Sequence, residues 1–375
     1  MSIALQTLWH ERSRYLGGVL SVTFAAVLIA LQCGLLLGLF KITSIPIDNT
    51  TADIWVGSTA VKSVDLGKPI PTSYITRIAG LPGVEMPEQY IANFATLTKP
   101  SGGTELCFLL GSVLDEGAAG AATMLTQEQR VALTLPDAII MDESKIEEFK
   151  LNTSGGKAKI NGKEVTVVGT VKGLKSLAAP WVFCSLYTAR HLMGFMLPPD
   201  HVSYFLARCE SPARAKEVAE ELRKQYGNDM MAYTAEEFST GSRVYWLLRT
   251  KAGVAIGFAA LLGLFVGAVI TAQTLYSATR ANAKEFAILL ALGIPRWRIS
   301  IMVLMQSFWV GIAGLVMAIP VCFGLWYLAR QFNADVDFRW EVLVGTTVVT
   351  MGMAVIAGFF ALRSVRQIEP MDLLR

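Results

Sequence analysis

Four long stretches of the chain are apolar almost throughout. They cover residues 16–40, 252–274, 301–328 and 342–362, and none contains Asp, Glu, Lys or Arg. A helix needs about 20 such residues to cross the hydrocarbon layer of a membrane, and a helix satisfies its own backbone groups in lipid. We therefore predict four transmembrane helices. The first stretch is too long for the core of a signal peptide and lacks a small-x-small cleavage site, so we expect an uncleaved anchor.

Positive charges in the short segments beside these stretches predict their orientation. The amino-terminal segment, the connection between spans two and three, and the tail together hold nine Lys and Arg residues: Arg12, Arg14, Arg280, Lys284, Arg296, Arg298, Arg363, Arg366 and Arg375. The connection between spans three and four holds two, Arg330 and Arg339. Since cytoplasmic loops are richer in Lys and Arg, we predict both termini in the cytoplasm and residues 41–248 outside it.

Residues 41–248 are numerous enough for a domain with its own core, and their pattern predicts a mixed α+β fold. Alternating residues at 89–98 and 104–113, separated by a Pro-Ser-Gly-Gly turn, predict a hairpin. A second hairpin is predicted around Asn161-Gly162, because this pair readily takes the two positive φ angles of a type I′ turn.

Two helices are predicted near the end of this segment. The first covers 212–226, with Ser211 as its cap and Pro212 in its first turn. The second begins at the capping box formed by Thr234 and Glu237. We expect it to continue without a break into the second span, so that the outer domain is coupled mechanically to the membrane.

Composition and motifs exclude several classes of protein. Apolar residues make up 53% of the chain, charged residues only 17%, and the net charge of +3 comes without the basic tract of a nucleic-acid-binding protein. The sequence has no catalytic motif, no metal-ligand spacing among its three histidines and no phosphate loop, since Gly155-Gly156-Lys157 lacks the required first glycine and hydroxyl residue. We therefore predict no catalytic residues, no metal site and no cofactor in this chain.

The five cysteines, Cys33, Cys107, Cys184, Cys209 and Cys322, show no CxxC spacing. A disulfide between Cys184 and Cys209 is one interpretation for an oxidising compartment, and buried free thiols are the other, which we favour.

The spans also carry no charges that would mark an ion pathway. A secondary transporter or proton pump is therefore disfavoured, and if the protein moves a substrate, another chain must supply the energy.

The connection between spans two and three predicts an amphipathic helix over about 280–293 that stops at Gly293 and Pro295. Phe286, Leu289, Leu290 and Leu292 supply its apolar side, whereas Arg280, Lys284 and Glu285 are polar. One interpretation is a helix that lies on lipid headgroups. The alternative is a helix that docks into the groove of a partner.

Three groups of residues resemble a known family. Thr279-Arg280, Glu285-Phe286-Ala287 and Ala291-Leu292-Gly293 resemble the "TR…E(F/I)A…R(A/S)LG" signature of FtsX-like permeases, the MacB/LolC/FtsX/DevC group of ABC transporters, although Leu290 replaces the usual basic residue. The tail, 361–375, is similar to the closing "A…A…I(D/E)P…(A/L)LR" of that group. The segment 8–15 before span one resembles the DevC-type branch, and 138–170 resembles the MacB-like periplasmic core.

The resemblance implies a domain organisation. A cytoplasmic amphipathic helix would cover 1–15, the first span 16–40, an extracytoplasmic MacB-like core domain 41–248, and an FtsX-like permease domain 249–375. It also implies a multi-pass protein of the bacterial inner membrane.

The resemblance further implies that the chain is a permease subunit without ATPase activity of its own. A separate cytoplasmic ABC ATPase would bind ATP and Mg, and the permease would form a homodimer or a heterodimer with a relative. A periplasmic membrane-fusion adaptor and membrane lipid are further expected partners, and nucleic acid is not. The helix 280–293 would couple the two proteins through Thr279, Arg280, Lys284, Glu285, Phe286, Ala287, Leu290, Leu292 and Gly293.

Glycines at GxxxG spacing let helices approach closely. They occur in span one as Gly34 and Gly38, and in span two as Gly253 with Gly257 and Gly263 with Gly267. Packing within one subunit explains them equally well. We predict that span two forms part of a dimer seam, because members of the resembled family dimerise mainly through spans one and two.

The expected function is ATP-driven export or extraction of an apolar or amphipathic substrate, in which the outer domains move and the substrate does not pass between the spans. An alternative is an FtsX-type regulator of a cell-wall hydrolase. A membrane enzyme or sensor is a third hypothesis, which the missing catalytic residues disfavour. The segment 174–197, with Trp181, Phe183, Tyr187, Phe195 and Met196, is interpreted as a core strand and helix or as a contact surface for cargo or adaptor. The sequence does not select the cargo.

Overall fold

The computed structural model of this chain describes residues 12–100, 102–149, 155–172, 179–281, 288, 292–331 and 340–366. These residues form two compact units. One, called the inserted domain below, contains residues 38–250, and the other, called the membrane unit, contains the chain up to residue 37 and most of the chain after residue 250. Residues 1–11, where the amino-terminal amphipathic helix was predicted to begin, and the tail 367–375 lie outside the described residues.

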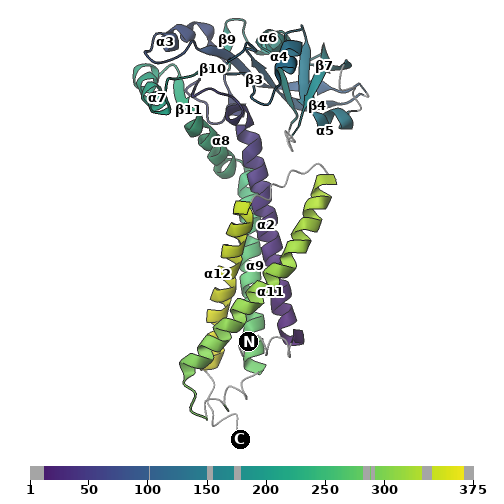
Figure 1. Cartoon of the computed structure of the whole chain (residues 1–375), viewed down its shortest axis with the longest axis vertical. Helices are drawn as coiled ribbons and strands as arrows, with labels where there is room; N and C mark the ends of the chain where they lie inside the picture. Colours follow the sequence, from purple (N-terminus) through teal and green to yellow (C-terminus); the bar gives the residue numbers. More distant parts are fainter. Residues whose placement is uncertain are drawn as a thin grey trace. The chain divides into compact units, whose positions relative to one another are not determined.

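The inserted domain contains both strands and helices (Figure 1). Its strands are β1 (Ile54–Gly57), β2 (Ile70–Pro71), β3 (Glu88–Thr98), β4 (Thr104–Ser112), β5 (Ala138–Asp142), β6 (Gly156–Ile160), β7 (Lys163–Val171), β8 (Trp181–Ser185), β9 (His201–Val202), β10 (Tyr204–Ala207) and β11 (Met231–Thr234). Its helices are α3 (Ile75–Ala79), α4 (Gln127–Leu133), α5 (Glu143–Glu148), α6 (Leu186–Met193), α7 (Pro212–Tyr226) and α8 (Ala235–Arg249), with short 3₁₀ turns at Val64–Leu66, Thr72–Tyr74 and Gly194–Met196.

Nine strands form one mixed sheet in the order β11-β1-β10-β3-β4-β8-β5-β7-β6. The sheet bends back on itself, because the end of the long strand β3 also pairs with β6, where Leu97 lies opposite Ile160. Strands β3, β4, β8, β5, β7 and β6 therefore close into a ring, and closure removes the free edges that would otherwise pair with other chains. The beginning of β3 pairs instead with β10 and so joins the ring to the rest of the sheet.

Alternation along the strands supplies a core on each face of the sheet. In β8, Trp181 and Phe183 lie in one core, and Val182 and Cys184 lie in the other. A third core forms where α7 packs against β11 at the edge of the sheet (Figure 1). Because both faces are buried, these strands are apolar at successive positions rather than alternating.

Several sequence predictions are confirmed here. The hairpins appear as β3–β4 and β6–β7, with Asn161 at φ 49° and Gly162 at φ 80° in the tight turn. Helix α7 begins after the Ser211 cap, and α8 begins at the predicted capping box. The described part of the 174–197 segment is the core strand β8 followed by α6, although Tyr187 remains 71% exposed.

The membrane unit consists of long apolar helices. They are α2 (Arg12–Asp48), α9 (Lys251–Ala281), α11 (Arg296–Gln331) and α12 (Trp340–Arg366). Four segments in them are long and apolar enough to cross a membrane: Leu16–Leu35, Gly253–Thr274, Trp297–Leu328 and Val342–Phe360. The predicted fold class, one span followed by a mixed domain and then three spans, is confirmed. In Figure 1, α11 is inclined to the other three helices.

Small and hydroxyl residues hold the spans together. Ser21 of α2 and Thr271 of α9 share a hydrogen bond of 3.0 Å, and the Thr23 hydroxyl donates to the Gly314 carbonyl of α11 at 3.1 Å. A hydrogen bond to this carbonyl requires the two helices to approach closely. Gly314 allows the approach because it has no Cβ, and a Cβ there would lie only 2.5 Å from Val22. These two hydrogen bonds join uncharged polar groups of neighbouring helices.

All five cysteines are free, which agrees with the interpretation we favoured. Cys184 lies in the core of the strand ring, whereas Cys209 lies next to the α7 core, so the two belong to different parts of the domain. Burial raises the pKa of the Cys107 thiol to about 12 and also raises that of Cys184. Burial and the nearby Asp53 carboxylate raise the pKa of Cys209 to about 11.

These raised pKa values predict slow alkylation of the folded chain. A thiol with a pKa near 12 is ionised in roughly one molecule in ten thousand at pH 8, and the thiolate is the reactive form. We expect iodoacetamide at pH 8 to leave Cys107, Cys184 and Cys209 unmodified in mild detergent and to modify all three after denaturation, as read by peptide mass mapping. A Tyr187→Cys variant provides the reactive control. A Cys184–Cys209 disulfide in the unreduced digest contradicts this prediction.

Candidate functional site: the contacts between the end of α2 and α8

The first turn of α8 is held to the rest of the inserted domain by an aromatic cluster. Phe238, in its first turn, stacks on Tyr233 with ring centroids 5.1 Å apart and contacts Trp55 and Tyr204 at 5.8 and 5.7 Å. Trp55 and Tyr204 are fully buried. The helix begins here because the Thr234 hydroxyl accepts from the Glu237 N–H and the Glu237 carboxylate accepts from the Thr234 N–H.

The last turns of α2 enter the same core. Ile45 and Ile47 are buried in the cluster that contains Trp55 and Phe238. Since α2 contains the first candidate span and α8 immediately precedes the helix of the second, the two chain segments that connect the spans to the inserted domain pack on one set of side chains.

A charged network joins these two helices directly. Asp48, the last residue of α2, accepts hydrogen bonds from the Ser44 hydroxyl at 2.6 Å, the Ser239 hydroxyl at 2.7 Å and the Arg243 guanidinium at 2.6 Å. Arg243 also donates to the Ser44 hydroxyl at 2.9 Å. One carboxylate thus holds two turns of α8 against the end of α2, and we call these four residues the α2–α8 clamp.

The position of Asp48 explains why Arg243 matters to it. The carboxyl end of a helix carries a partial negative charge, so an acidic residue there is unfavourable on its own. Arg243 supplies the compensating positive charge. The two side chains are 37% and 40% exposed, so solvent screens the pair, and we expect a contribution of about 1 kcal/mol rather than that of a buried ion pair.

A second set of contacts extends the attachment along α8. The Trp246 indole N–H donates to the Asp65 carboxylate at 3.1 Å, and the Val64 N–H donates to the Ser242 hydroxyl at 3.2 Å. Ser63 also donates to Asp65. The 3₁₀ turn Val64–Leu66 therefore contacts α8 at Ser242 and at Trp246, the second of which lies beyond the part of the helix held by the clamp.

The prediction of one continuous helix into the second span is wrong. Helix α8 ends at Arg249, and Thr250 has the extended angles φ −96° and ψ 148°, before α9 begins at Lys251. The Thr250 hydroxyl donates to the Trp246 carbonyl at 2.5 Å. A β-branched residue whose hydroxyl bonds the preceding turn ends the helix readily, because it competes with the backbone donor for the same carbonyl.

The predicted coupling helix falls largely outside the described residues. Lys284, Glu285, Phe286, Ala287 and Leu290 lie there, and Thr279 lies in the last turns of α9. Among the described residues of this segment, Arg280 and Leu292 are exposed. Gly293 has φ 85°, which is typical of the residue that follows a helix. The role of this segment therefore stays a prediction.

The glycines of the predicted dimer seam differ in their surroundings. A Cβ at Gly263 would lie 2.8 Å from Leu28, and one at Gly267 would lie 2.4 Å from Ala25, so these two let α9 pack on α2 within the chain. At Gly257 a Cβ would meet nothing within 4 Å. Gly34 is buried in α2, Gly253 is buried near the start of α9, and Gly38 is a helical residue of α2.

Sequence reasoning missed the α2–α8 clamp. Asp48 and Arg243 are 195 positions apart, and no local pattern relates them. Ser239 and Arg243 lie four positions apart and therefore share one side of α8, but this spacing does not indicate Asp48 as their partner. Among the described residues, no group of three or more His, Cys, Asp or Glu side chains has the arrangement of a metal site.

The chain is similar to known permeases. Residues 257–370 match the FtsX-like permease C-terminal family, and these residues include most of α9, all of α11 and α12. An uncharacterized ABC transporter permease of Methanocaldococcus jannaschii is 26% identical over 232 residues. That alignment covers 59% of this chain and 57% of the relative, so little more than half of each is aligned. The resemblance to FtsX-like permeases is thus confirmed, and the DevC-type branch stays a prediction.

Two solved structures are similar to the inserted domain. The periplasmic region of MacB from Actinobacillus actinomycetemcomitans is 13% identical with a TM-score of 0.36 and covers 52% of this chain and 94% of that one. The extracellular domain of the noncanonic ABC-type transporter YknZ from Gram-positive bacteria is 15% identical with a TM-score of 0.34 and covers 48% and 98%.

A double-mutant cycle tests the clamp. We expect Asp48→Asn and Arg243→Gln each to lower the melting temperature of the full chain in detergent, and the double variant to lose about 1 kcal/mol less than their sum. For a domain of about 150–250 residues, a range that includes the inserted domain, that coupling corresponds to roughly 2–4 °C. The exposed pair Lys157–Glu164 is the control, for which we expect additive effects. Additive effects at Asp48 and Arg243 contradict the assignment.

Proposed function

We propose that this chain is the permease subunit of an ABC transporter that transmits ATP-driven motion from a separate ATPase to the inserted domain, for export or extraction of an apolar or amphipathic substrate. The observation that carries the proposal is the FtsX-like family match over the last three spans. Since the spans contain no charged residue, they offer no ion pathway of their own, which favours an energy source on another chain.

The α2–α8 clamp supports a mechanical role for the inserted domain. A motion of the first span relative to the second reaches the domain through α2 and α8. The end of α2 and the beginning of α8 contact one core. The extended residue Thr250 ends α8 before α9 begins. We place the protein in the inner membrane of a bacterium with both termini in the cytoplasm, in agreement with the distribution of Lys and Arg.

Partner binding is assigned to the segment 280–293. Its polar side carries Arg280, Lys284 and Glu285, and its apolar side, with Phe286 and Leu292, suits a groove on the ATPase. ATP and Mg are expected on that ATPase and not on this chain. A membrane-fusion adaptor remains a further expected partner of the inserted domain.

Co-purification with an ATPase tests the proposed function. We expect the tagged full chain, isolated from its host in mild detergent, to retain an ABC ATPase, and Glu285→Lys with Phe286→Ala to recover at least about tenfold less of it, which corresponds to about 1.4 kcal/mol. The matched control is Glu220→Lys with Tyr187→Ala, because both side chains are exposed on the inserted domain. Recovery of the host ATPase is measured by mass spectrometry and by ATP turnover. If no ATPase is recovered with wild type, the transporter assignment is wrong.

A dimer seam along α9 is the second part of the proposal. Gly253–Thr274 is the least buried of the four spans. Phe258, Leu261 and Phe265, which follow helical spacing along one side, are 64–66% exposed. An apolar helix face of this kind contacts either lipid or a second permease, and we assign it to the second permease.

Photo-crosslinking tests the seam without interference from the native cysteines. We expect benzoylphenylalanine at Phe258 or Phe265 to give a covalent dimer of the full chain in membranes. The same substitution at Phe323 of α11, which is 59% exposed, is expected to give lipid adducts only. Dimer bands are read by denaturing electrophoresis and mass spectrometry. Lipid adducts from all three positions would remove α9 from the interface.

A further inference from the structure

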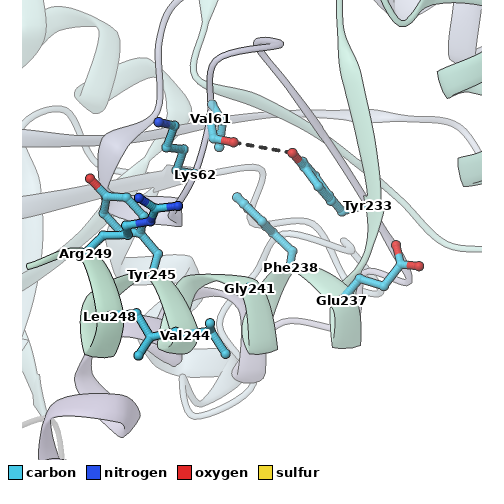
Figure 2. Close-up of a pocket in the computed structure, with 10 residues that line it drawn as sticks. All are labelled: Val61, Lys62, Tyr233, Glu237, Phe238, Gly241, Val244, Tyr245, Leu248 and Arg249. Atoms are coloured by element: carbon cyan, nitrogen blue, oxygen red, sulfur yellow. Dashed lines mark hydrogen bonds between the residues drawn. The ribbon is translucent and has the colours of Figure 1, made fainter. Parts of the chain in front are cut away.

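An open groove runs along one side of α8. It encloses about 440 Å³, within the range of ligand pockets. Ten residues line it: Val61, Lys62, Tyr233, Glu237, Phe238, Gly241, Val244, Tyr245, Leu248 and Arg249 (Figure 2). All belong to the inserted domain. The α2–α8 clamp uses a different side of α8, so the groove is not explained by the contacts described above.

The residues of α8 that line the groove include both charged and apolar side chains. Glu237, Gly241, Val244 and Leu248 recur at intervals of three or four residues and therefore lie on one side of the helix. Val244 is 46% exposed and Leu248 is 64% exposed. Two apolar side chains left open to solvent beside a pocket favour an occupant with an apolar part.

Gly241 keeps the middle of the groove empty. Glycine is a poor helix former, and it is tolerated in helix interiors where neighbours approach closely or where φ is positive. Neither reason holds here, since a Cβ at Gly241 would meet nothing within 4 Å and its φ is not positive. Figure 2 shows Gly241 between Phe238 and Val244. Because Gly241 lines the groove, a larger side chain there would occupy it.

The charge at the two ends of the groove differs. Lys62 and Arg249 lie at one end in Figure 2, and neither pairs with a carboxylate in the part of the chain that the structure describes. Glu237 lies at the other end, about 18 Å away along the helix. Its carboxylate is already bound by Arg223 and by the Thr234 N–H, so it does not cancel the positive end.

The positive end is also the one joined to a span. Arg249 precedes Gly253, the first residue of the second candidate span, by four residues. Four residues extend over at most about 14 Å, so the chain keeps Arg249 close to the membrane surface. Lys and Arg at that depth attract anionic headgroups, and Tyr245 is an aromatic residue of the type enriched there.

We propose that this groove binds one phospholipid with an anionic headgroup, with the phosphate between Lys62 and Arg249 and an acyl chain along Val244, Leu248 and the space above Gly241. The positively charged end of the groove matches the anionic headgroup of such a lipid, and the apolar part of the groove matches its acyl chain. The binding goes beyond the proposed transport function, because it requires no ATPase, and it is tested without one.

Lipid titration of the purified full chain tests this site. Native mass spectrometry in non-ionic detergent compares dioleoyl phosphatidylglycerol with dioleoyl phosphatidylcholine, which has the same acyl chains and no net charge. We expect the first phosphatidylglycerol to bind wild type about tenfold more tightly than phosphatidylcholine. Lys62→Gln with Arg249→Gln is expected to bring the two lipids within twofold of each other.

Substitutions at Gly241 separate the apolar part of the site from its charge. We expect Gly241→Phe to weaken the first binding step of both lipids at least fivefold, because the ring fills the groove. Gly241→Ala is the matched control and should stay within twofold of wild type, since its Cβ enters open space. A thermal melt of each variant confirms that it is folded, and the glutamine variant tests the site even if Gly241→Phe does not fold.

Three results would overturn the proposal. The first is equal binding of the two lipids to wild type, and the second is unchanged binding of phosphatidylglycerol to a folded Gly241→Phe. The third is loss of a dimer from the mass spectrum of Gly241→Phe with lipid binding intact, which would assign the groove to a second copy of this chain.

Discussion

The carboxylate of Asp48 is the point through which the two helical connections of the inserted domain hold each other. It closes the end of α2 and accepts from Ser239 and Arg243 of α8. Without the guanidinium of Arg243, an acidic residue at the carboxyl end of a helix would be unfavourable, and the two helices would keep the Ser239 hydrogen bond and the apolar core. The aromatic cluster around Phe238 supplies the larger share of burial, but it is non-directional, whereas the clamp specifies which sides of the helices meet.

The clamp and the apolar core constrain the two helices in different ways. Apolar contacts are non-directional, whereas the hydrogen bonds from Ser239 and Arg243 to Asp48 specify how the end of α2 lies against α8. In the second connection the extended residue Thr250 lies between α8 and α9, so the two are not one continuous helix.

The membrane unit combines close packing on one side of α9 with exposure on another. Gly263 and Gly267 bring it against α2, and Phe258 and Phe265 are left outside the bundle. Packing against α2 within the chain thus explains one glycine pair. The exposed aromatic side chains of α9 require contact with a partner or with lipid. The groove beside Gly241 repeats this theme in the inserted domain, where space is kept at the expense of helix propensity.

The sequence by itself determined the elements whose signals are local. Uncharged apolar runs predicted all four spans, because no other structure satisfies such a run in lipid. Asn161-Gly162 and the capping box at Thr234 predicted their turn and helix start, because their effect depends on immediate neighbours. Only the tertiary structure decided the ring closure between β3 and β6, the clamp at Asp48 and the open space beside Gly241. Each joins residues far apart in the chain, and such contacts depend on how the whole core packs, to which no local periodicity responds.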